Sequence, residues 1–361
     1  MAYSDLGHTQ LAVSKICLGT MTFGEGNTYQ EACAQLDMAS EAGVNFIDSA
    51  EMYPVPQKAE TQGRSEEMVG QWMKERHNRD KIIVATKVAG PSGQMTWIRG
   101  GPHTLDRRNI KEAIDDSLRR LQTDYIDLYQ IHWPDRYVPM FGDIDYDPSN
   151  AFTSVTFEEQ LAALAEAKQA GKIRHVGLSN ETPYGLAKFL ECAQGGIDDG
   201  TDYPRVQAIQ NAYHLLCRTF DSGVAEICHQ EKVSLLAYSP LAMGHLTGKY
   251  LTGDGGPPGA RLNKYRCRYA EAESRYSFTK PNLVAAVRAY AKLAEQSGLS
   301  LTGLALGFVL RHPLVASAVI GATSPEQLQE LLTIATEQPP LSEDVMSGID
   351  KIHRRYPSPA P

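Results

Sequence analysis

The stretch Ile82-Ile83-Val84-Ala85-Thr86-Lys87 is a short run of apolar and β-branched residues that ends on a lysine. Two other runs have the same form, because Val44–Asp48 ends on an aspartate and Ile126–His132 ends on a histidine. Such nearly continuous apolar runs are typical of parallel strands that helices cover. Each of the three ends on a side chain that can hold a charge or exchange a proton.

Five further runs complete a set of eight strand candidates, and amphipathic stretches that begin at capping residues separate them. One helix is expected after Thr156, which has Glu159 at capping-box spacing, and others are expected to be capped by Ser324 and Asn109. The eight strand candidates are Ile16–Gly19, Val44–Asp48, Ile82–Lys87, Ile126–His132, Ile173–Ser179, Val206–Gln210, Ser234–Ser239 and Ala318–Gly321.

Eight strand–helix alternations without a break in composition predict an α/β fold, a (β/α)8 TIM barrel that spans residues 1–361 as a single domain. The rival fold is a doubly wound sheet with a second domain, which needs Gly-x-Gly-x-x-Gly after its first strand. The nearest match, Gly24–Tyr29, lacks the third glycine. The barrel is therefore the better interpretation.

Two long insertions follow predicted strands and therefore belong to the carboxyl-terminal face of the barrel. Residues 133–155 are rich in aromatic residues, proline and aspartate, and their aromatic side chains predict an apolar lining for a substrate pocket. Residues 251–278 contain the stretch Gly253–Arg261, which is too polar and glycine-rich to predict regular structure. Long loops on this face of a barrel usually act as lids over a site.

The composition limits the kind of protein this is. Because 43 acidic residues outnumber 35 basic ones, and no Lys/Arg cluster reverses that balance, no nucleic-acid partner is expected. The six cysteines are scattered without a Cys-x-x-Cys pair, so neither a metal site nor a disulfide framework is predicted. The sequence shows no signal peptide and no membrane span, which indicates a cytoplasmic protein in a reducing compartment.

Four residues form the candidate catalytic group. Asp48, Lys87 and His132 end the second, third and fourth predicted strands, which are neighbours in a barrel, and Tyr53 follows Asp48 by five residues. Taken one at a time, each is more often structural, for example a turn cap or a packed ring. Their convergence at one end of neighbouring strands favours an acid/base site instead.

The chemistry that such a group supports is proton transfer from a phenol. A free tyrosine has a pKa of about 10 and is a weak acid near neutral pH. We expect the Lys87 ammonium to lower the pKa of Tyr53, while Asp48 keeps Lys87 charged and in position. His132 is expected to donate a hydrogen bond to the same substrate oxygen. These side chains supply no nucleophile, so a cofactor is expected.

Polar residues at the later strand ends are suited to holding that cofactor. Ser179, Asn180 and Gln210 offer hydroxyl and amide groups for a carboxamide, and Tyr238 offers a face for a flat ring. A helix that begins after Gly321-Ala322-Thr323-Ser324 presents free N–H groups, which suit a phosphate, although a plain helix cap is the simpler reading of Ser324 alone. Lys249 and Arg261 on the second insertion add positive charge.

Together these residues resemble the aldo-keto reductases, and most of all the bacterial Tas-like branch of that family. The order and context of Asp48, Tyr53, Lys87 and His132 are similar to the family's tetrad. The other stretches that carry the resemblance are Cys17–Gly24, Glu51–Pro56, Glu60–Gly63, Leu121–Tyr125, Gly171–Asn180, Ala237–Leu241 and Ile320–Gln327.

The resemblance implies a (β/α)8 barrel that binds NADP(H) without a Rossmann domain and reduces a small aldehyde or ketone, with Tyr53 as the proton donor. It leaves the identity of the carbonyl compound and the oligomeric state open. By the same carry-over, residues 251–278 would border the cofactor. The cofactor residues that it implies, including those already named, are Thr20, Met21, Asp48, Ser179, Asn180, Gln210, Tyr238, Ser239, Pro240, Leu241, Ala242, Met243, Lys249, Arg261, Gly321, Thr323, Gln327 and Glu330.

Two other functions compete with the reductase. A Schiff-base aldolase would use Lys87, because such lysines also end barrel strands, but it needs the lysine neutral and Asp48 would keep it charged. The second is a cofactor-binding sensor or regulatory subunit with little turnover, since the same fold serves in that role. Loss of function in a Tyr53→Phe variant would argue against a purely regulatory role.

Overall fold

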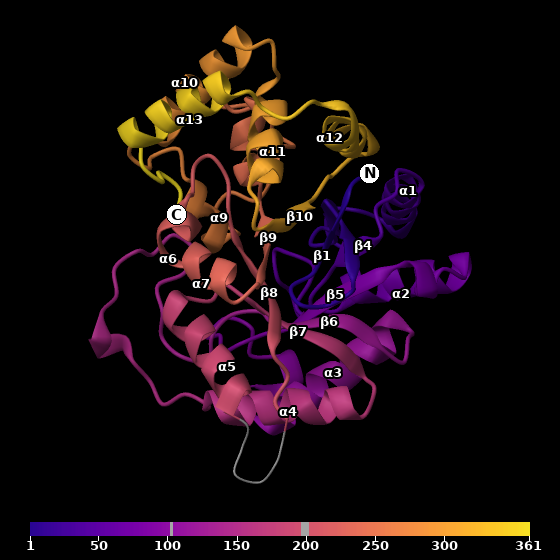
Figure 1. The fold of residues 1–361 in the computed structure, drawn as a ribbon. Helices are drawn as coiled ribbons and strands as arrows, with labels where there is room; N and C mark the ends of the chain where they lie inside the picture. Colours follow the sequence, from indigo (N-terminus) through magenta and orange to yellow (C-terminus); the bar gives the residue numbers. More distant parts are fainter. Residues whose placement is uncertain (102–103, 196–201) are drawn as a thin grey trace.

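The computed structural model describes residues 1–101, 104–195 and 202–361 (Figure 1). Within these residues, parallel strands close into an eight-stranded barrel in the order β10-β3-β4-β5-β6-β7-β8-β9. The predicted (β/α)8 barrel is therefore confirmed, and each predicted strand overlaps an observed one. The barrel strands are β3 (Ile16–Gly19), β4 (Phe46–Asp48), β5 (Ile83–Val88), β6 (Ile126–Ile131), β7 (Ile173–Ser179), β8 (Val206–Ala212), β9 (Ser234–Tyr238) and β10 (Val315–Ile320).

Helices surround the barrel, as Figure 1 shows. They are α1 (Tyr29–Glu41), α2 (Arg64–Arg76), α3 (Arg107–Leu121), α4 (Phe157–Gln169), α5 (Pro183–Gly195), α6 (Thr219–Gly223), α7 (Ala225–Gln230), α8 (Arg261–Lys264), α9 (Ala270–Tyr276), α10 (Leu283–Gln296), α11 (Leu301–Arg311), α12 (Pro325–Glu337) and α13 (Glu343–Arg355).

Two of the three predicted helix caps are observed. Thr156 accepts a hydrogen bond from Glu159 N, and Ser324 accepts one from Gln327 N, as expected of capping residues. The prediction for α3 was wrong, because Asp106 is its cap and accepts from Asn109 N. Asn109 instead lies in the first turn of α3, three residues beyond its cap.

A hairpin that the sequence did not predict closes the amino-terminal end of the barrel. Its strands are β1 (Tyr3–Asp5) and β2 (Ala12–Ser14). Leu6 and Val13 pack in one buried cluster with side chains from inside the barrel, and Gly7 N donates to Ser234 Oγ at the start of β9. Because one end is covered in this way, a ligand has to enter from the carboxyl-terminal end.

Strand register brings polar side chains together at the carboxyl-terminal end. Asp48 pairs with Gly19 on one side and Ala85 on the other. Lys87 pairs with Gln130 of β6, and Ser179 pairs with Gln210 of β8. These residues therefore lie at similar heights around one opening.

The two insertions differ from each other. The first, 133–155, contains only the short 3-10 helix η3 (Pro148–Asn150), and its Ile144, Tyr146 and Phe152 side chains are exposed. In the second, 251–278, residues 253–260 have no helix or strand, as expected of that stretch, but α8 and α9 follow it and were not predicted. The aromatic residues Tyr265, Tyr269 and Tyr276 of this segment are buried and hold it against the molecule.

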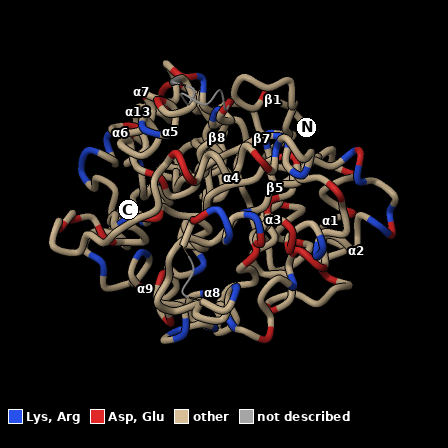
Figure 2. Tube along the Cα trace, turned by 90° about the horizontal axis from the view of Figure 1, so that it is seen from below, with Lys and Arg blue, Asp and Glu red and all other residues tan. Residues whose placement is uncertain are grey.

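Charged positions are spread over the molecule. Figure 2 shows Lys and Arg interspersed with Asp and Glu along the trace, without one continuous basic face in that view. No single helix among the described residues is long and apolar enough to cross a membrane; α10 and α11 reach that length and composition only together and are bent by 93° at their junction.

Candidate active site

A buried ion pair forms the base of the site. Lys87 Nζ donates to Asp48 Oδ2 at 2.5 Å and to Ser49 O at 2.7 Å, and its side chain is fully buried. Asp48 Oδ1 accepts further bonds from Gln130 Nε2 at 3.1 Å and Gln210 Nε2 at 2.8 Å. Three donors on one carboxylate offset much of the cost of burying two charges.

Tyr53 and His132 meet above this pair. Their rings are 5.6 Å apart in an edge-to-face arrangement, and Lys87 Nζ lies 5.1 Å from the centre of the Tyr53 ring. Tyr53, His132 and Asp48 line one cavity at the end of the barrel, whereas Lys87 lies behind Asp48 and outside its lining. The expected convergence of the four residues is therefore observed.

The pKa of Tyr53 differs from the value that the sequence analysis expected. Burial raises the pKa of Tyr53 well above its ordinary value, and the Asp48 carboxylate raises it further. The pKa of Tyr53 is therefore raised, whereas the sequence analysis expected it to be lowered. The physical reason is that burial and the Asp48 charge both disfavour the phenolate, while the Lys87 ammonium is paired with Asp48. Burial, and then the Lys87 charge, hold the pKa of His132 well below its ordinary value.

A second buried ion pair holds the segment that carries Tyr53. Glu51 is buried and accepts from Ala89 N at 2.6 Å, while Arg99 Nη1 bonds both of its carboxylate oxygens. Glu51 N in turn donates to Lys87 O at 3.1 Å. The loop after β4 is thereby fastened to β5 and its following loop, which fixes the position of Tyr53.

The strand ends on the other side of the opening are linked by hydrogen bonds. Asn180 Nδ2 donates to His132 O at 2.9 Å, and Asn180 Oδ1 accepts from Tyr238 Oη at 2.7 Å. Ser179 Oγ donates to the backbone oxygen of Gln210 at 2.8 Å. The polar groups predicted to bind a carboxamide therefore form one wall of the cavity.

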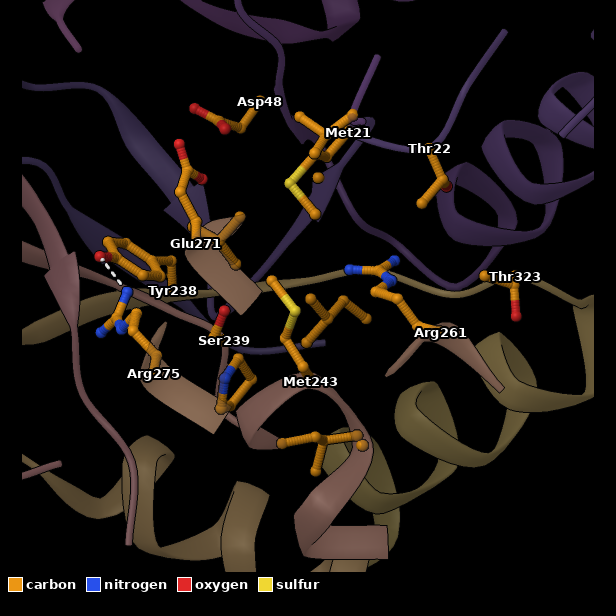
Figure 3. A pocket seen from close by; sticks show the side chains of 18 of the residues that line it. Met21, Thr22, Asp48, Tyr238, Ser239, Met243, Arg261, Glu271, Arg275 and Thr323 are labelled. Carbon is orange, nitrogen blue, oxygen red and sulfur yellow. Dashed lines mark hydrogen bonds between the residues drawn. The ribbon is translucent and has the colours of Figure 1, made fainter. Parts of the chain in front are cut away.

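Arg275 extends this wall from α9. Its Nη1 donates to Tyr238 Oη at 2.9 Å and its Nε to Pro361 O at 3.2 Å, and Figure 3 shows the bond to Tyr238. Because the Tyr238 hydroxyl accepts from Arg275, its own O–H is directed to Asn180 Oδ1 as the donor of that hydrogen bond. Sequence reasoning missed Arg275, since no helix was predicted in the part of the insertion that carries it.

Four non-glycine residues of this region have a left-handed backbone, at Asn180, Ser239, Ala242 and Met243, with φ between 47° and 55°. This conformation costs free energy in residues with a side chain and persists where the surrounding structure enforces it, most often at functional sites. Ser239 follows β9 directly, and Ala242 and Met243 begin the 3-10 helix η4 (Ala242–Thr247). The strained segment thus borders the cavity that sequence analysis singled out.

Charged residues gather at the far end of the cavity. Lys249, Arg261 and Glu330 line it together with Thr323 and Gln327, and Figure 3 shows Arg261 directed into it. Burial lowers the pKa of Lys249, and the nearby Arg261 lowers it further. Two cations against the single carboxylate of Glu330 leave a net positive charge at this end, which suits an anionic group.

The cavity lining contains sixteen of the eighteen expected cofactor residues. The two that it does not contain are Thr20 and Ala242, which are fully buried. Thr20 Oγ1 donates to Asp48 O at 3.0 Å and shares a bond with Ser65 Oγ at 2.6 Å, so it supports the site from beneath. The sixteen are Met21, Asp48, Ser179, Asn180, Gln210, Tyr238, Ser239, Pro240, Leu241, Met243, Lys249, Arg261, Gly321, Thr323, Gln327 and Glu330.

Two further residues of the site were missed. Gln130 is a polar residue in the middle of an apolar strand, and that interruption is a signal that could have identified it. Glu271 lines the cavity from α9, and its sequence context offers no comparable signal. Both are placed by tertiary contacts rather than by a local motif.

Comparison with known proteins agrees with this geometry. The model of the Aldo/keto reductase family matches residues 15–354. Protein tas of Escherichia coli strain K12 is 46% identical over 361 residues, which is the full length of both chains. An aldo-keto reductase of Babesia bovis is 39% identical over 292 residues, 77% of this chain and 98% of that protein. The NADH-specific methylglyoxal reductase of E. coli K12 is 29% identical over 345 residues, 90% of each chain.

Proposed function

This chain belongs to the aldo/keto reductase family, and from that premise we propose that it is an NADPH-dependent oxidoreductase that reduces a small aldehyde or ketone to an alcohol. The observation that carries the proposal is the placement of a neutral phenol and a neutral imidazole over one opening, with a buried Lys–Asp pair beneath. A relative named for methylglyoxal reduction supports a small carbonyl compound as the substrate.

The residues around the cavity fit a nicotinamide cofactor. The amide nitrogen of Gln210 donates to Asp48 Oδ1. Its amide oxygen is therefore free to accept from the carboxamide of the nicotinamide. Asn180 and Ser179 adjoin it, and Tyr238 offers a ring face at the end of β9. Ser239 to Met243 and Lys249 would border the diphosphate, and Thr323 and Gln327 would border the adenosine. A reduced nicotinamide bound there supplies the hydride.

Tyr53 acts as the general acid in this proposal. Its raised pKa means that the phenol holds its proton at neutral pH, so the hydroxyl can give that proton to the carbonyl oxygen as the carbon accepts the hydride. The new O–H and C–H bonds complete the alcohol. Lys87 holds the Asp48 carboxylate in place and lies 5.1 Å from the centre of the Tyr53 ring.

His132 orients the substrate. Its lowered pKa keeps the imidazole uncharged, so one ring nitrogen can donate a hydrogen bond to the carbonyl oxygen without competing as an acid. Its ring lies edge-on to Tyr53, and Asn180 holds its backbone oxygen. The carbonyl oxygen is thereby directed between the two rings.

The choice of NADPH rests on charge. Lys249 and Arg261 at the far end of the cavity suit a 2′-phosphate, while Glu330 beside them opposes it. A relative is NADH-specific by name, so the preference has to come from this chain's own residues. We expect an Arg261→Ala variant to lose affinity for NADPH by about tenfold, from one lost charge contact, and to bind NADH as before.

The proposal also covers the organisation and location of the protein. Residues 1–361 act as one domain, in which 133–155 borders the substrate and 251–278 borders the cofactor. Six unpaired cysteines support a cytoplasmic location. Lys87 is buried, paired with Asp48 and outside the cavity lining, so nothing favours the aldolase alternative.

The decisive experiment is a fluorescence titration with NADPH and NADH, followed by turnover of propanal and a panel of other aldehydes and ketones. Tight NADPH binding with turnover of at least one carbonyl is the expected result. NADPH binding without turnover of any of them would favour the regulatory subunit. Failure to bind either nucleotide would remove the oxidoreductase proposal.

A further inference from the structure

Helix α9 presents a carboxyl group to the cavity that the proposed reaction does not use. Glu271 lines the cavity together with Tyr53, His132 and Trp133. Figure 3 shows its carboxyl group directed into the cavity on the side of Asp48. Its charge is close enough to contribute to the raised pKa of Tyr53. Glu271 therefore faces the space in which the carbonyl group would react.

Hydrogen bonds to three other segments hold α9 in place. Arg275, one turn after Glu271, bonds Tyr238 and the backbone of Pro361. Ser274 Oγ bonds the backbone oxygen of Phe141, which ties α9 to the first insertion. Contacts at three places thus fix the direction in which Glu271 points.

The surroundings of Glu271 only partly stabilise a charged carboxylate. Burial raises its pKa, whereas Arg275, Tyr269 and Gln57 lower it, and the net direction is upward. Arg275 is already committed to two other acceptors, and Asp48 adds a second acid to the same cavity. A further anion placed here would be repelled or would force Glu271 to take up a proton. A hydroxyl or ammonium group would gain an acceptor.

We propose that Glu271 determines substrate specificity: it favours carbonyl compounds that carry a hydroxyl or ammonium group next to the carbonyl, and disfavours those that carry a carboxylate. This inference rests on the proposed reductase function. It assigns to α9 a selective role at the same site, separate from the proton transfer by Tyr53.

Three aldehydes of similar size test the proposal: propanal is neutral, glycolaldehyde carries a hydroxyl, and glyoxylate carries a carboxylate. The kcat/KM of each is measured with NADPH for the wild-type protein, for Glu271→Gln and Glu271→Ala, and for the control Glu273→Gln. Glu273 lies on the same helix but is exposed, and glutamine keeps its acceptor for Cys267 N. The intrinsic reactivity of each aldehyde cancels in the ratio of variant to wild type.

For both Glu271 variants, we expect kcat/KM for glyoxylate relative to propanal to rise about tenfold, as expected for removal of one nearby like charge. The same ratio for glycolaldehyde should fall in Glu271→Ala, which has no acceptor for the hydroxyl, and Glu273→Gln should change neither ratio. If the wild-type protein reduces propanal and both Glu271 variants keep the wild-type ratios, the specificity role is wrong and the reductase proposal stands. If the wild-type protein binds NADPH and reduces no aldehyde or ketone, both proposals are wrong.

Discussion

The ammonium nitrogen of Lys87 lies 2.5 Å from Asp48 Oδ2, and both side chains are almost entirely buried. Removing one partner would leave the other as an uncompensated charge in the barrel. We therefore expect Asp48→Asn to lower the free energy of unfolding by about 3–5 kcal/mol. Urea unfolding measures the change, and the double variant Asp48→Asn/Lys87→Met should lose less than the sum of the two single variants.

An exposed pair provides the control for that experiment. Arg107 Nη2 lies 2.7 Å from Glu166 Oε1, but the two side chains are 66% and 43% exposed. Because solvent screens such pairs, Glu166→Gln should cost about 1 kcal/mol or less. Equal losses from Asp48→Asn and Glu166→Gln would contradict the view that burial makes the first pair important.

Tyr53→Phe removes the proposed acid and keeps the ring. We expect kcat for carbonyl reduction to fall by about 100-fold or more, because the proton donor is gone. The dissociation constant for NADPH should stay within about twofold, since the ring still packs against His132. Stopped-flow and fluorescence titration separate the two quantities. Tyr184→Phe, at a phenol that is 60% exposed, should change neither.

Arg275 is expected to act as a positioning residue through Tyr238. Because it donates to Tyr238 Oη, Arg275→Met should free the Tyr238 hydroxyl and weaken NADPH binding by about tenfold, as for a lost hydrogen bond to a charged group. Arg275→Lys should recover part of that affinity, since the ammonium can reach one acceptor. Exposed Arg354→Gln on α13 serves as the control. Unchanged NADPH affinity in Arg275→Met would show that the contact is structural only.

Two buried imidazoles make stability depend on pH. Burial holds the pKa of His132 and of His214 well below 6.5. Between the folded and unfolded pKa values the unfolded chain binds more protons, so stability is full above about pH 6.5 and is lost as the pH falls. We expect a loss of up to about 1.4 kcal/mol per pH unit for each imidazole.

His214 allows that expectation to be tested away from the cavity. Its Nδ1 accepts from Leu216 N at 3.2 Å and its Nε2 contacts Tyr276 Oη at 3.1 Å, so a second ring proton would break the first bond. Urea unfolding at pH 5, 6 and 7 should show a shallower pH dependence for His214→Gln than for the wild-type protein. Exposed His229→Gln should keep the wild-type slope. An unchanged slope in His214→Gln would mean that His214 titrates alike in both states.

Sequence patterns predicted the main parts of the site for a definite physical reason. In a parallel barrel, every strand delivers its last residues to one rim, so locating the ends of β4, β5 and β6 also placed Asp48, Lys87 and His132. The amino-terminal hairpin was missed because its two three-residue strands are partly exposed and do not form an apolar run. The helices in 251–278 were missed because their buried tyrosines are scattered among charged residues.

By itself, the sequence determined the barrel, its strand ends and the four candidate catalytic residues, since alternating apolar runs and caps act locally. Only the tertiary structure decided the charge states of Tyr53 and His132, because burial and the pairing of Lys87 with Asp48 set them. It also decided that Glu271 and Arg275 reach the cavity. Their positions depend on contacts between segments far apart in the chain, which no local pattern encodes.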